Sequence, residues 1–329
     1  MEQYAVKWLR QPGGTITDIS ARAGGLTYTD DLDSLATHLT LDVQQGTLDP
    51  YHKLLAISCG DRIQLYKDGA LVVDGQITTV SGDYRERQQL IVYDDGVILT
   101  QNDLIIQYNG VSADTAIRQL CGKLGITVAA VPAMPTKITQ IYHESVSSIL
   151  TGILDTVTAE TGRKFKIRVR GGKLYVAQTG IETVSARYRA ADNLGAHPVQ
   201  WQAGSPSVKR SIDELRNAVQ IYSDQDGAVR ILASASDSAG IARYGSRMKV
   251  DTYSDKDGAS AAQKAKTLLA SLNRETEEIS VQTFGADSVT AGVLMDFDLT
   301  EFSGKFLVTA VTKNYGHPYT MDLTLRRAE

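Results

Sequence analysis

Two stretches near opposite ends of the chain share one glycine-punctuated β pattern, residues 60–93 (GDRIQLYKDGALVVDGQITTVSGDYRERQQLIVY) and residues 292–325 (GVLMDFDLTEFSGKFLVTAVTKNYGHPYTMDLTL). In each stretch a short strand after a glycine leads to a second glycine, Gly75 or Gly304. A further strand, a tyrosine and an alternating last strand follow. The gaps between these landmarks differ by a few residues, so the repeat rests on order more than on identity. The pattern predicts one β-barrel built twice.

The composition is that of a globular protein. The chain has 329 residues, of which 42% are hydrophobic and 22% are charged, so it can bury a sizeable core and is expected to divide into two or three domains. Its net charge of −4 and pI near 5.8 argue against a dedicated binder of duplex DNA or of an anionic membrane surface. Specific nucleic-acid binding is therefore not expected.

The N-terminus (MEQYAVKWLRQPGG) lacks the apolar core of a signal peptide. No run approaches the roughly 20 apolar residues that a membrane span requires. We therefore expect assembly in a reducing cytoplasm without a membrane partner. Cys59 and Cys121 are the two cysteines, and their separation does not suggest a disulfide framework.

Residues 1–100 are predicted to form the first antiparallel barrel. Apolar side chains alternate there at period two between turn signals, at Leu39, Leu41, Val43, Ile63, Leu65, Leu90 and Val92.

Residues 101–195 are predicted to form a helix-helix-hairpin domain of the α+β class. Helical spacing joins Ile117, Leu120, Cys121 and Leu124, and then Val146, Ile149, Leu150, Ile153, Leu154 and Val157. Ser112 is expected to cap the first helix, and Gly125 and Gly162 are expected to end the two helices. Strand alternation from Phe165 to Val169, followed by a Gly-Gly turn, predicts the hairpin.

Residues 196–329 are predicted to form the second barrel. A stretch rich in Gly, Pro, Ser and Ala near residues 193–211 marks the boundary. One inserted helix is expected at about 259–273, where a stripe of Ala and Leu recurs at helical spacing, and it would cover an open end of the barrel. The fold class is therefore mainly β, with two antiparallel barrels joined by an α+β middle domain.

Residues that could carry chemistry are sparse. The five histidines, His38, His52, His143, His197 and His317, are scattered without a paired spacing, and no Cys-x-x-Cys is present, so we expect no metal site. Cys121 lies on the apolar face of a helix, which favours a core thiol over a nucleophile.

Two Asp-x-Asp-Gly stretches, residues 224–227 and 255–258, do not fit calcium loops. In either stretch a tyrosine would take the first ligand position of the loop, and in the second a lysine would take the last. Both are interpreted as turns. The acidic run Asp30-Asp31-Leu32-Asp33 could offer paired carboxylates, but no partner can be assigned from sequence, so a solvated strand entry is expected. No catalytic residues and no cofactor are predicted.

The predicted hairpin is strongly basic. Lys164, Lys166, Arg168 and Arg170 alternate along one strand face, and no acidic residue occurs between Glu160 and Glu182. One interpretation is an electropositive interaction patch that meets an acidic neighbour or passing nucleic acid. The other is a solvated face of a hairpin whose opposite face covers the helix before it. On the second interpretation, charge reversal at the four positions should leave folding intact.

Four stretches together resemble the baseplate hub proteins of contractile phage tails and tail-like particles, the group that includes the late control D proteins. They are residues 28–43 (YTDDLDSLATHLTLDV), residues 60–66 with 73–77, residues 93–94 and 99–102 with 112–126, and residues 310–316 with 321–325. The resemblance spans most of the chain. Each stretch is largely a β pattern with fixed glycines.

The resemblance implies two tail-tube-like barrels per chain and a homotrimer with pseudo-sixfold symmetry. Such a ring would adapt the sixfold tail tube to the threefold central spike and would help to nucleate tube assembly. The implied partners are the chain itself, the tube protein, the spike, and the tape measure and other baseplate proteins, in a virion or tail-like particle. A β-rich glycan-binding or cell-surface module, and a tail-associated cell-wall hydrolase, are the alternatives.

Overall fold

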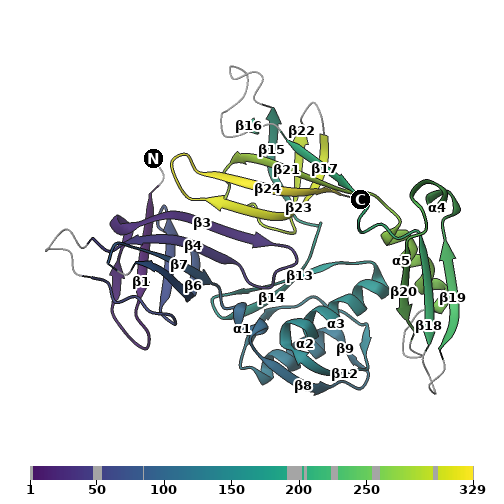
Figure 1. Ribbon diagram of the computed structural model, residues 1–329. Coiled ribbons are helices and arrows are strands. Elements are labelled where there is room, and N and C mark those ends of the chain that lie inside the picture. The colour runs from purple at the N-terminus through teal and green to yellow at the C-terminus, as the bar shows by residue number, and fades with distance from the viewer. Residues whose placement is uncertain are drawn as a thin grey trace.

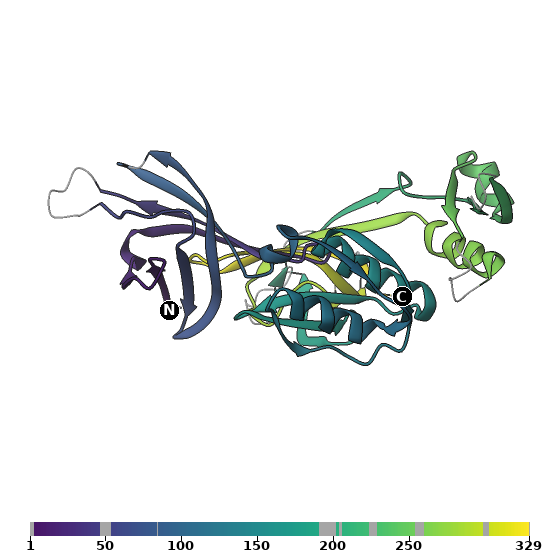
Figure 2. The same cartoon turned by 90° about the horizontal axis from the view of Figure 1, so that it is seen from below.

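The computed structural model describes residues 3–46, 54–83, 85–190, 202–203, 206–223, 229–253, 260–298 and 303–328. Three parts are visible in Figure 1: a large β-sheet, an α/β domain below it, and a smaller unit of three strands and two helices, here called the distal unit. Figure 2 shows the N-terminal strands and the distal unit at opposite ends of an elongated molecule. The described chain is mainly β, as predicted.

The large sheet has fourteen strands, which come from both ends of the chain. They are β1 (Tyr4–Leu9), β2 (Ile16–Asp18), β3 (Ala23–Asp31), β4 (His38–Gln44), β5 (Arg62–Lys67), β6 (Ala70–Asp83), β7 (Arg87–Tyr93), β15 (Thr183–Ala190), β16 (Gln202–Ala203), β17 (Ser207–Ser211), β21 (Thr276–Phe284), β22 (Leu294–Asp298), β23 (Ser303–Asn314) and β24 (Thr320–Arg327). A short 3₁₀ helix, η1 (Ser20–Arg22), precedes β3.

Neighbouring strands follow the order β17-β21-β16-β15-β22-β23-β3-β4-β7-β6-β5-β1-β2, and β24 pairs with both β21 and β23. All pairings are antiparallel except those of β15 with β16 and with β22. Both predicted meanders therefore belong to one continuous sheet, and no closed barrel is detected among the described strands.

The two meanders have the predicted order of strands. β5, β6 and β7 pair in succession, and so do β22, β23 and β24. The alternation in β4 is confirmed, because Leu39, Leu41 and Val43 are fully buried, as period-two packing against one face requires.

The second glycine of each meander has a different physical role. Gly75 lies within β6, where a Cβ would come 2.4 Å from the carbonyl oxygen of Tyr93, so no side chain fits. Gly304 lies near the start of β23 and has open space around it, but its φ of +112° is strained for any other residue. The two glycines agree in order along the chain but not in structure.

The two halves of the large sheet are joined side by side. β23 pairs antiparallel with β3, from Ala310 opposite Asp31 to Asn314 opposite Thr27. This pairing links residues about 280 positions apart. Figure 1 shows it where the yellow strands meet the purple ones.

The turn that connects β23 to β24 also reaches the N-terminal half. Tyr315 and Tyr319 are buried in the hydrophobic core formed by β1 and β3–β7. Tyr4 contacts the Tyr315 ring edge-on, with ring centroids 5.7 Å apart. The C-terminal hairpin therefore helps to complete the N-terminal core.

The α/β domain contains three helices and seven short strands. They are α1 (Val97–Thr100), β8 (Asp103–Gln107), β9 (Val111–Ser112), α2 (Ala113–Lys123), β10 (Thr127–Ala130), β11 (Lys137–Ile138), β12 (Ile141–Ser145), α3 (Val146–Thr161), β13 (Phe165–Arg170) and β14 (Lys173–Gln178). Both main helices and the hairpin are confirmed. Ser112 does occupy the N-cap of α2, but its hydroxyl bonds to Thr115 and not to the backbone. The sequence analysis did not identify β8 and β12, which pair with each other.

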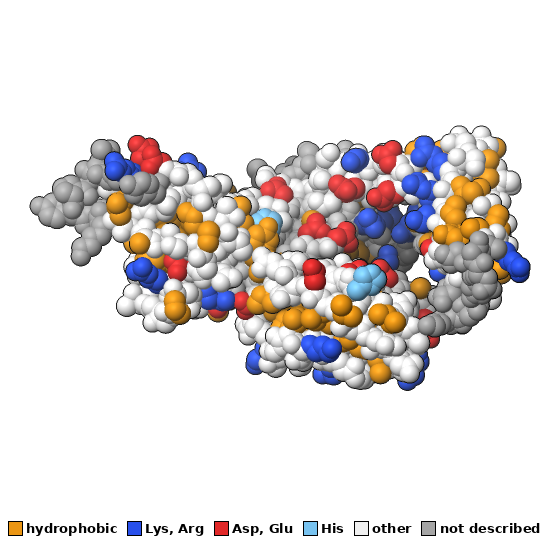
Figure 3. Space-filling model, turned by 60° about the horizontal axis from the view of Figure 1, so that its bottom comes forward, with side chains coloured by type: hydrophobic (Ala, Val, Ile, Leu, Met, Phe, Trp, Pro, Cys, Tyr) orange, Lys and Arg blue, Asp and Glu red, His pale blue; other side chains and the backbone are white. Residues whose placement is uncertain are grey.

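The distal unit consists of β18 (Ala218–Ser223), β19 (Arg230–Ser236), α4 (Ser238–Tyr244), β20 (Met248–Thr252) and α5 (Ala261–Leu272). The expected helix is therefore present as α5, but it packs on its own three-stranded sheet, around Val219, Ile221 and Ala265. On other faces of this unit, Ile231, Leu232, Met248 and Val250 are exposed, and Figure 3 shows hydrophobic side chains gathered there.

The chain re-enters the large sheet earlier than expected. β15 begins at Thr183 and pairs with β22, although the domain boundary was placed at residue 195. That boundary itself lies outside the described residues.

Candidate functional site

A buried carboxylate, Asp30, links three parts of the chain. Its Oδ1 accepts a hydrogen bond from Nζ of Lys166 in β13 at 2.5 Å. Its Oδ2 accepts from the backbone N–H of Ala291 at 3.0 Å and from Nη2 of Arg168 at 3.3 Å. We call these four residues the Asp30 joint. They tie β3 of the N-terminal half to the hairpin of the α/β domain and to the segment before β22.

The cations of the joint have further partners. Nζ of Lys166 also donates to the backbone oxygen of Asp31, and Arg168 also donates to the backbone oxygen of Ala291. Burial lowers the pKa of Lys166, and the nearby charge of Asp30 opposes that shift. Nε of Arg168 is buried and has no hydrogen-bond partner among the described residues.

A second buried lysine lies on β23. The Nζ of Lys313 donates to the backbone oxygen of Asp287 at 3.0 Å, and its side chain is almost fully buried. Burial lowers the pKa of Lys313 to about 8, because water no longer solvates the charged form.

This shift predicts a pH dependence of stability. A lysine in the unfolded chain titrates near pH 10.5. Below pH 8, Lys313 is therefore charged in both the folded and the unfolded protein, and the folded protein bears the full cost of desolvating that charge. As pH rises above 8 the folded state releases its proton first, and stability should rise by up to about 1.4 kcal/mol per pH unit. Unfolding midpoints measured from pH 7.5 to 9.5 should rise more steeply in the wild type than in Lys313→Met, which keeps only the contribution of Lys166. Lys305→Met, an exposed position on the same strand, should rise as steeply as the wild type; an equal slope in Lys313→Met would contradict the assignment.

A cleft of about 340 Å³ lies between the hairpin and the segment before β22. Its lining includes Lys166, Arg168, Arg170, Tyr175, Glu182 and Ala291. We call it the basic cleft. Figure 3 shows one face of the molecule on which basic and acidic side chains gather around a hollow.

The four residues of the predicted electropositive patch have different environments. Lys164 and Arg170 are exposed, Lys166 is 5% exposed and Arg168 is 22% exposed. The interpretation of a wholly solvated face is therefore wrong for Lys166, because that face packs against the large sheet. We therefore no longer expect charge reversal at Lys166 to leave folding intact.

The acidic run also differs from expectation. Asp30 is 1% exposed and is not part of a solvated strand entry. Sequence offered one signal for it, since a run of basic residues on one strand face requires counter-charge somewhere. The sequence could not show that the counter-charge is 136 residues away along the chain.

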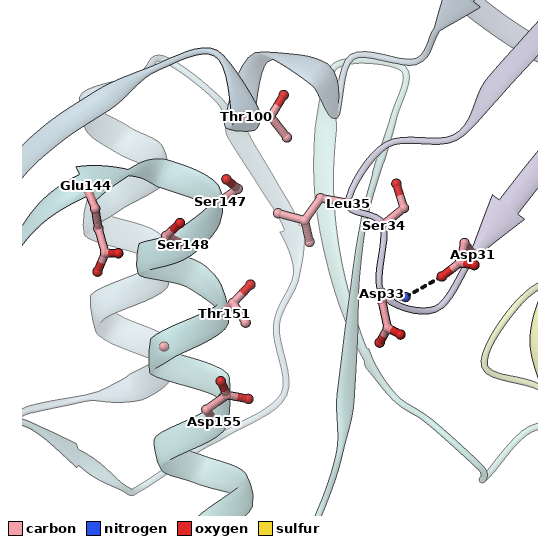
Figure 4. Close-up of a pocket in the computed structure, with 11 residues that line it drawn as sticks. Asp31, Asp33, Ser34, Leu35, Thr100, Glu144, Ser147, Ser148, Thr151 and Asp155 are labelled. Carbon is pink, nitrogen blue, oxygen red and sulfur yellow. Dashed lines mark hydrogen bonds between the residues drawn. The ribbon is translucent and has the colours of Figure 1, made fainter. Parts of the chain in front are cut away.

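A second, larger cleft of about 740 Å³ separates the turn after β3 from α3. Figure 4 shows Asp31 at the end of β3 and Asp33 on the turn at one side of this cleft, and Ser147, Ser148, Thr151 and Asp155 of α3 at the other side. The backbone N–H of Asp33 donates to Asp31 Oδ1 at 2.8 Å, and burial raises the pKa of Asp155. Within the described ranges no group of three or more His, Cys, Asp or Glu residues could hold a metal ion.

The remaining candidates are structural or lie outside the described residues. Cys121 is fully buried and its pKa is raised to about 11 by burial, which confirms a core thiol. Of the histidines, His52 and His197 lie outside the described residues, as do the stretches 224–227 and 255–258.

Two solved structures with a similar fold are described as tail proteins. The tail protein from Neisseria meningitidis MC58 matches with a TM-score of 0.70 at 17% identity, over 98% of this chain and 96% of that one. The 43 kDa tail protein of prophage MuSo2 from Shewanella oneidensis matches with a TM-score of 0.69 at 14% identity, over 99% of this chain and 98% of that one. The chain thus has a tail-protein fold.

A more distant match is the E. coli c3393 protein, described as a component of the type VI secretion system with structural similarity to T4 tail proteins gp27 and gp5. Its TM-score is 0.53 at 9% identity, over 94% of this chain and 74% of that one. The YQBQ-like family model matches residues 26–326, and the chain belongs to this family. No curated protein matches the sequence. In the described part of the chain, no helix is long and apolar enough to cross a membrane.

Proposed function

We propose that this chain is a structural baseplate hub protein of a contractile tail or tail-like particle. Three copies would form a pseudo-sixfold ring that adapts the sixfold tail tube to the threefold spike and helps to nucleate tube assembly. The partners would be the tube protein, the central spike, and the tape measure and other baseplate proteins. The protein would have no enzymatic role.

The observation that carries this proposal is the side-by-side pairing of the two halves of the large sheet through β3 and β23. One chain would thereby present two β modules, each with a meander of similar strand order and each serving as a tube-like module, and three chains would present six. The tail-protein fold supports the same conclusion.

The ends of the large sheet supply a means of assembly. Among the described strands, β2 pairs only with β1, and β17 pairs only with β21. Each therefore offers unpaired backbone groups along its outer edge, which pairing with a neighbouring subunit would satisfy. Ring closure through such edges would make the sheet continuous around the channel.

The test is the mass of the purified protein by light scattering at high concentration, with negative-stain images of the same fraction. We expect rings with an open centre and a mass of three times 35.7 kDa. A compact monomer that remains monomeric when the spike and tube proteins of the same particle are added would overturn the proposal.

A further inference from the structure

We propose that the basic cleft binds carboxylate side chains of an acidic, extended segment of a partner protein. Arg168 and Arg170 of β13, together with Lys173 of β14, would hold the carboxylates. This inference does not depend on the trimeric ring.

The cleft carries more positive than negative charge. Two cations of the joint, Lys166 and Arg168, share one buried carboxylate, Asp30. Arg170 lines the same cleft and makes no ion pair with any described residue, and Glu182 is the one carboxylate among the described lining residues. With Asp30 counted, three cations face two carboxylates at this cleft, so its surplus positive charge would favour an anion.

The hairpin also places two like charges opposite each other. Arg170 and Lys173 are direct cross-strand partners, so their side chains lie on one face of the hairpin. Both are exposed. Like charges in this position repel each other. The carboxylate of Asp95 accepts from the N–H of Gly172 in the turn between them, but it is also paired with Arg62, so a further anion would offset the repulsion.

The spacing of the cations fits an extended chain. Lys166, Arg168 and Arg170 occupy alternate positions of β13, so neighbouring side chains on this face are separated by about 7 Å. Carboxylates at alternate positions of an extended segment have the same spacing. Tyr175, which is paired with Arg168 across the hairpin and is 38% exposed, offers an apolar surface beside them.

Carboxylates fit this site better than a nucleic-acid backbone does. The cleft is short and bounded, whereas a nucleic-acid groove requires a basic stripe that follows many phosphates.

The test uses the full chain and a fluorescein-labelled peptide of four Glu-Ser repeats, with binding followed by fluorescence anisotropy. A single-stranded dT8 oligonucleotide and a peptide of four Lys-Ser repeats are the comparison probes. We expect saturable binding of the Glu-Ser peptide that weakens as salt is raised. The double variant Arg170→Ala with Lys173→Ala should lose about tenfold or more in affinity, because charge-assisted hydrogen bonds are lost.

The matched control is Lys209→Ala with Lys249→Ala, which removes the same two charges from exposed positions on β17 and β20. It should bind the Glu-Ser peptide as the wild type does. Equal loss in both double variants would show that only net charge matters and would overturn the proposal. Tighter binding of dT8 than of the peptide would also overturn it and would assign the cleft to nucleic acid. A change in the oligomeric state of the double variant Arg170→Ala with Lys173→Ala would overturn it as well and would assign the cleft to a second copy of this chain.

Discussion

Replacing Asp30 with alanine should destabilise the protein by about 3–5 kcal/mol, the cost of removing one partner from a buried ion pair. The carboxylate is 1% exposed and accepts hydrogen bonds from Lys166, Arg168 and the backbone of Ala291. Without it, Lys166 remains buried with only a backbone oxygen as partner. Urea unfolding followed by circular dichroism should show a large fall in the midpoint.

The control is Asp33→Ala, which removes the same charge from an exposed position in the turn after β3. It should change the unfolding free energy by less than about 0.5 kcal/mol. The double variant Asp30→Leu with Lys166→Met should recover part of the loss, since it removes the buried unpaired lysine, while Arg168 and the N–H of Ala291 still lack their acceptor. If the unfolding free energy of Asp30→Ala lies within about 0.5 kcal/mol of the wild-type value, the Asp30 joint does not hold the three parts together.

The parts of the fold that sequence predicted are those with local patterns. β4 could be predicted because its buried side chains alternate, and α3 because its buried side chains recur every three or four residues. Each pattern requires only neighbouring residues to face one core. Both meanders were predicted for the same reason.

The parts that sequence missed depend on partners far along the chain. Lys166 alternates with apolar residues, as a residue on a solvated strand face does. It is nevertheless buried, because its face of the hairpin packs against Asp30 on a strand that is remote in sequence. The pairing of β3 with β23 is equally non-local, so no period within either strand could indicate it. The distal sheet was not predicted because the residues of β19 that pack on its core are the alanines Ala233 and Ala235, which give only a weak hydrophobic alternation in the sequence.

The second large effect is expected at Tyr319, where the C-terminal hairpin enters the N-terminal core. Its ring stacks on Tyr315, with centroids 5.0 Å apart, and Nζ of Lys67 lies 4.1 Å from its centroid. Its hydroxyl donates to Asp287 Oδ1 at 2.9 Å, and burial raises its pKa, which keeps this donor protonated. Tyr319→Ala should cost about 3–5 kcal/mol, as for other large aromatic side chains removed from a core.

Tyr319→Phe is the matched control, because it keeps the ring and removes only the hydroxyl. It should cost about 0.5–1.5 kcal/mol in the same urea experiment. A loss as large as that of Tyr319→Ala would mean that the bond to Asp287, and not packing of the ring in the N-terminal core, supplies most of the stabilisation at this position.

Gly285 provides an independent test of the packing. A Cβ at this position would lie 2.3 Å from the Tyr319 ring, so Gly285→Ala should be destabilising by about 1–3 kcal/mol in the wild type. In the Tyr319→Ala background the same methyl group would enter the space left by the ring and should cost little. The two substitutions would then be strongly non-additive, as expected for residues in direct contact. Additive losses would place the Tyr319 ring away from Gly285.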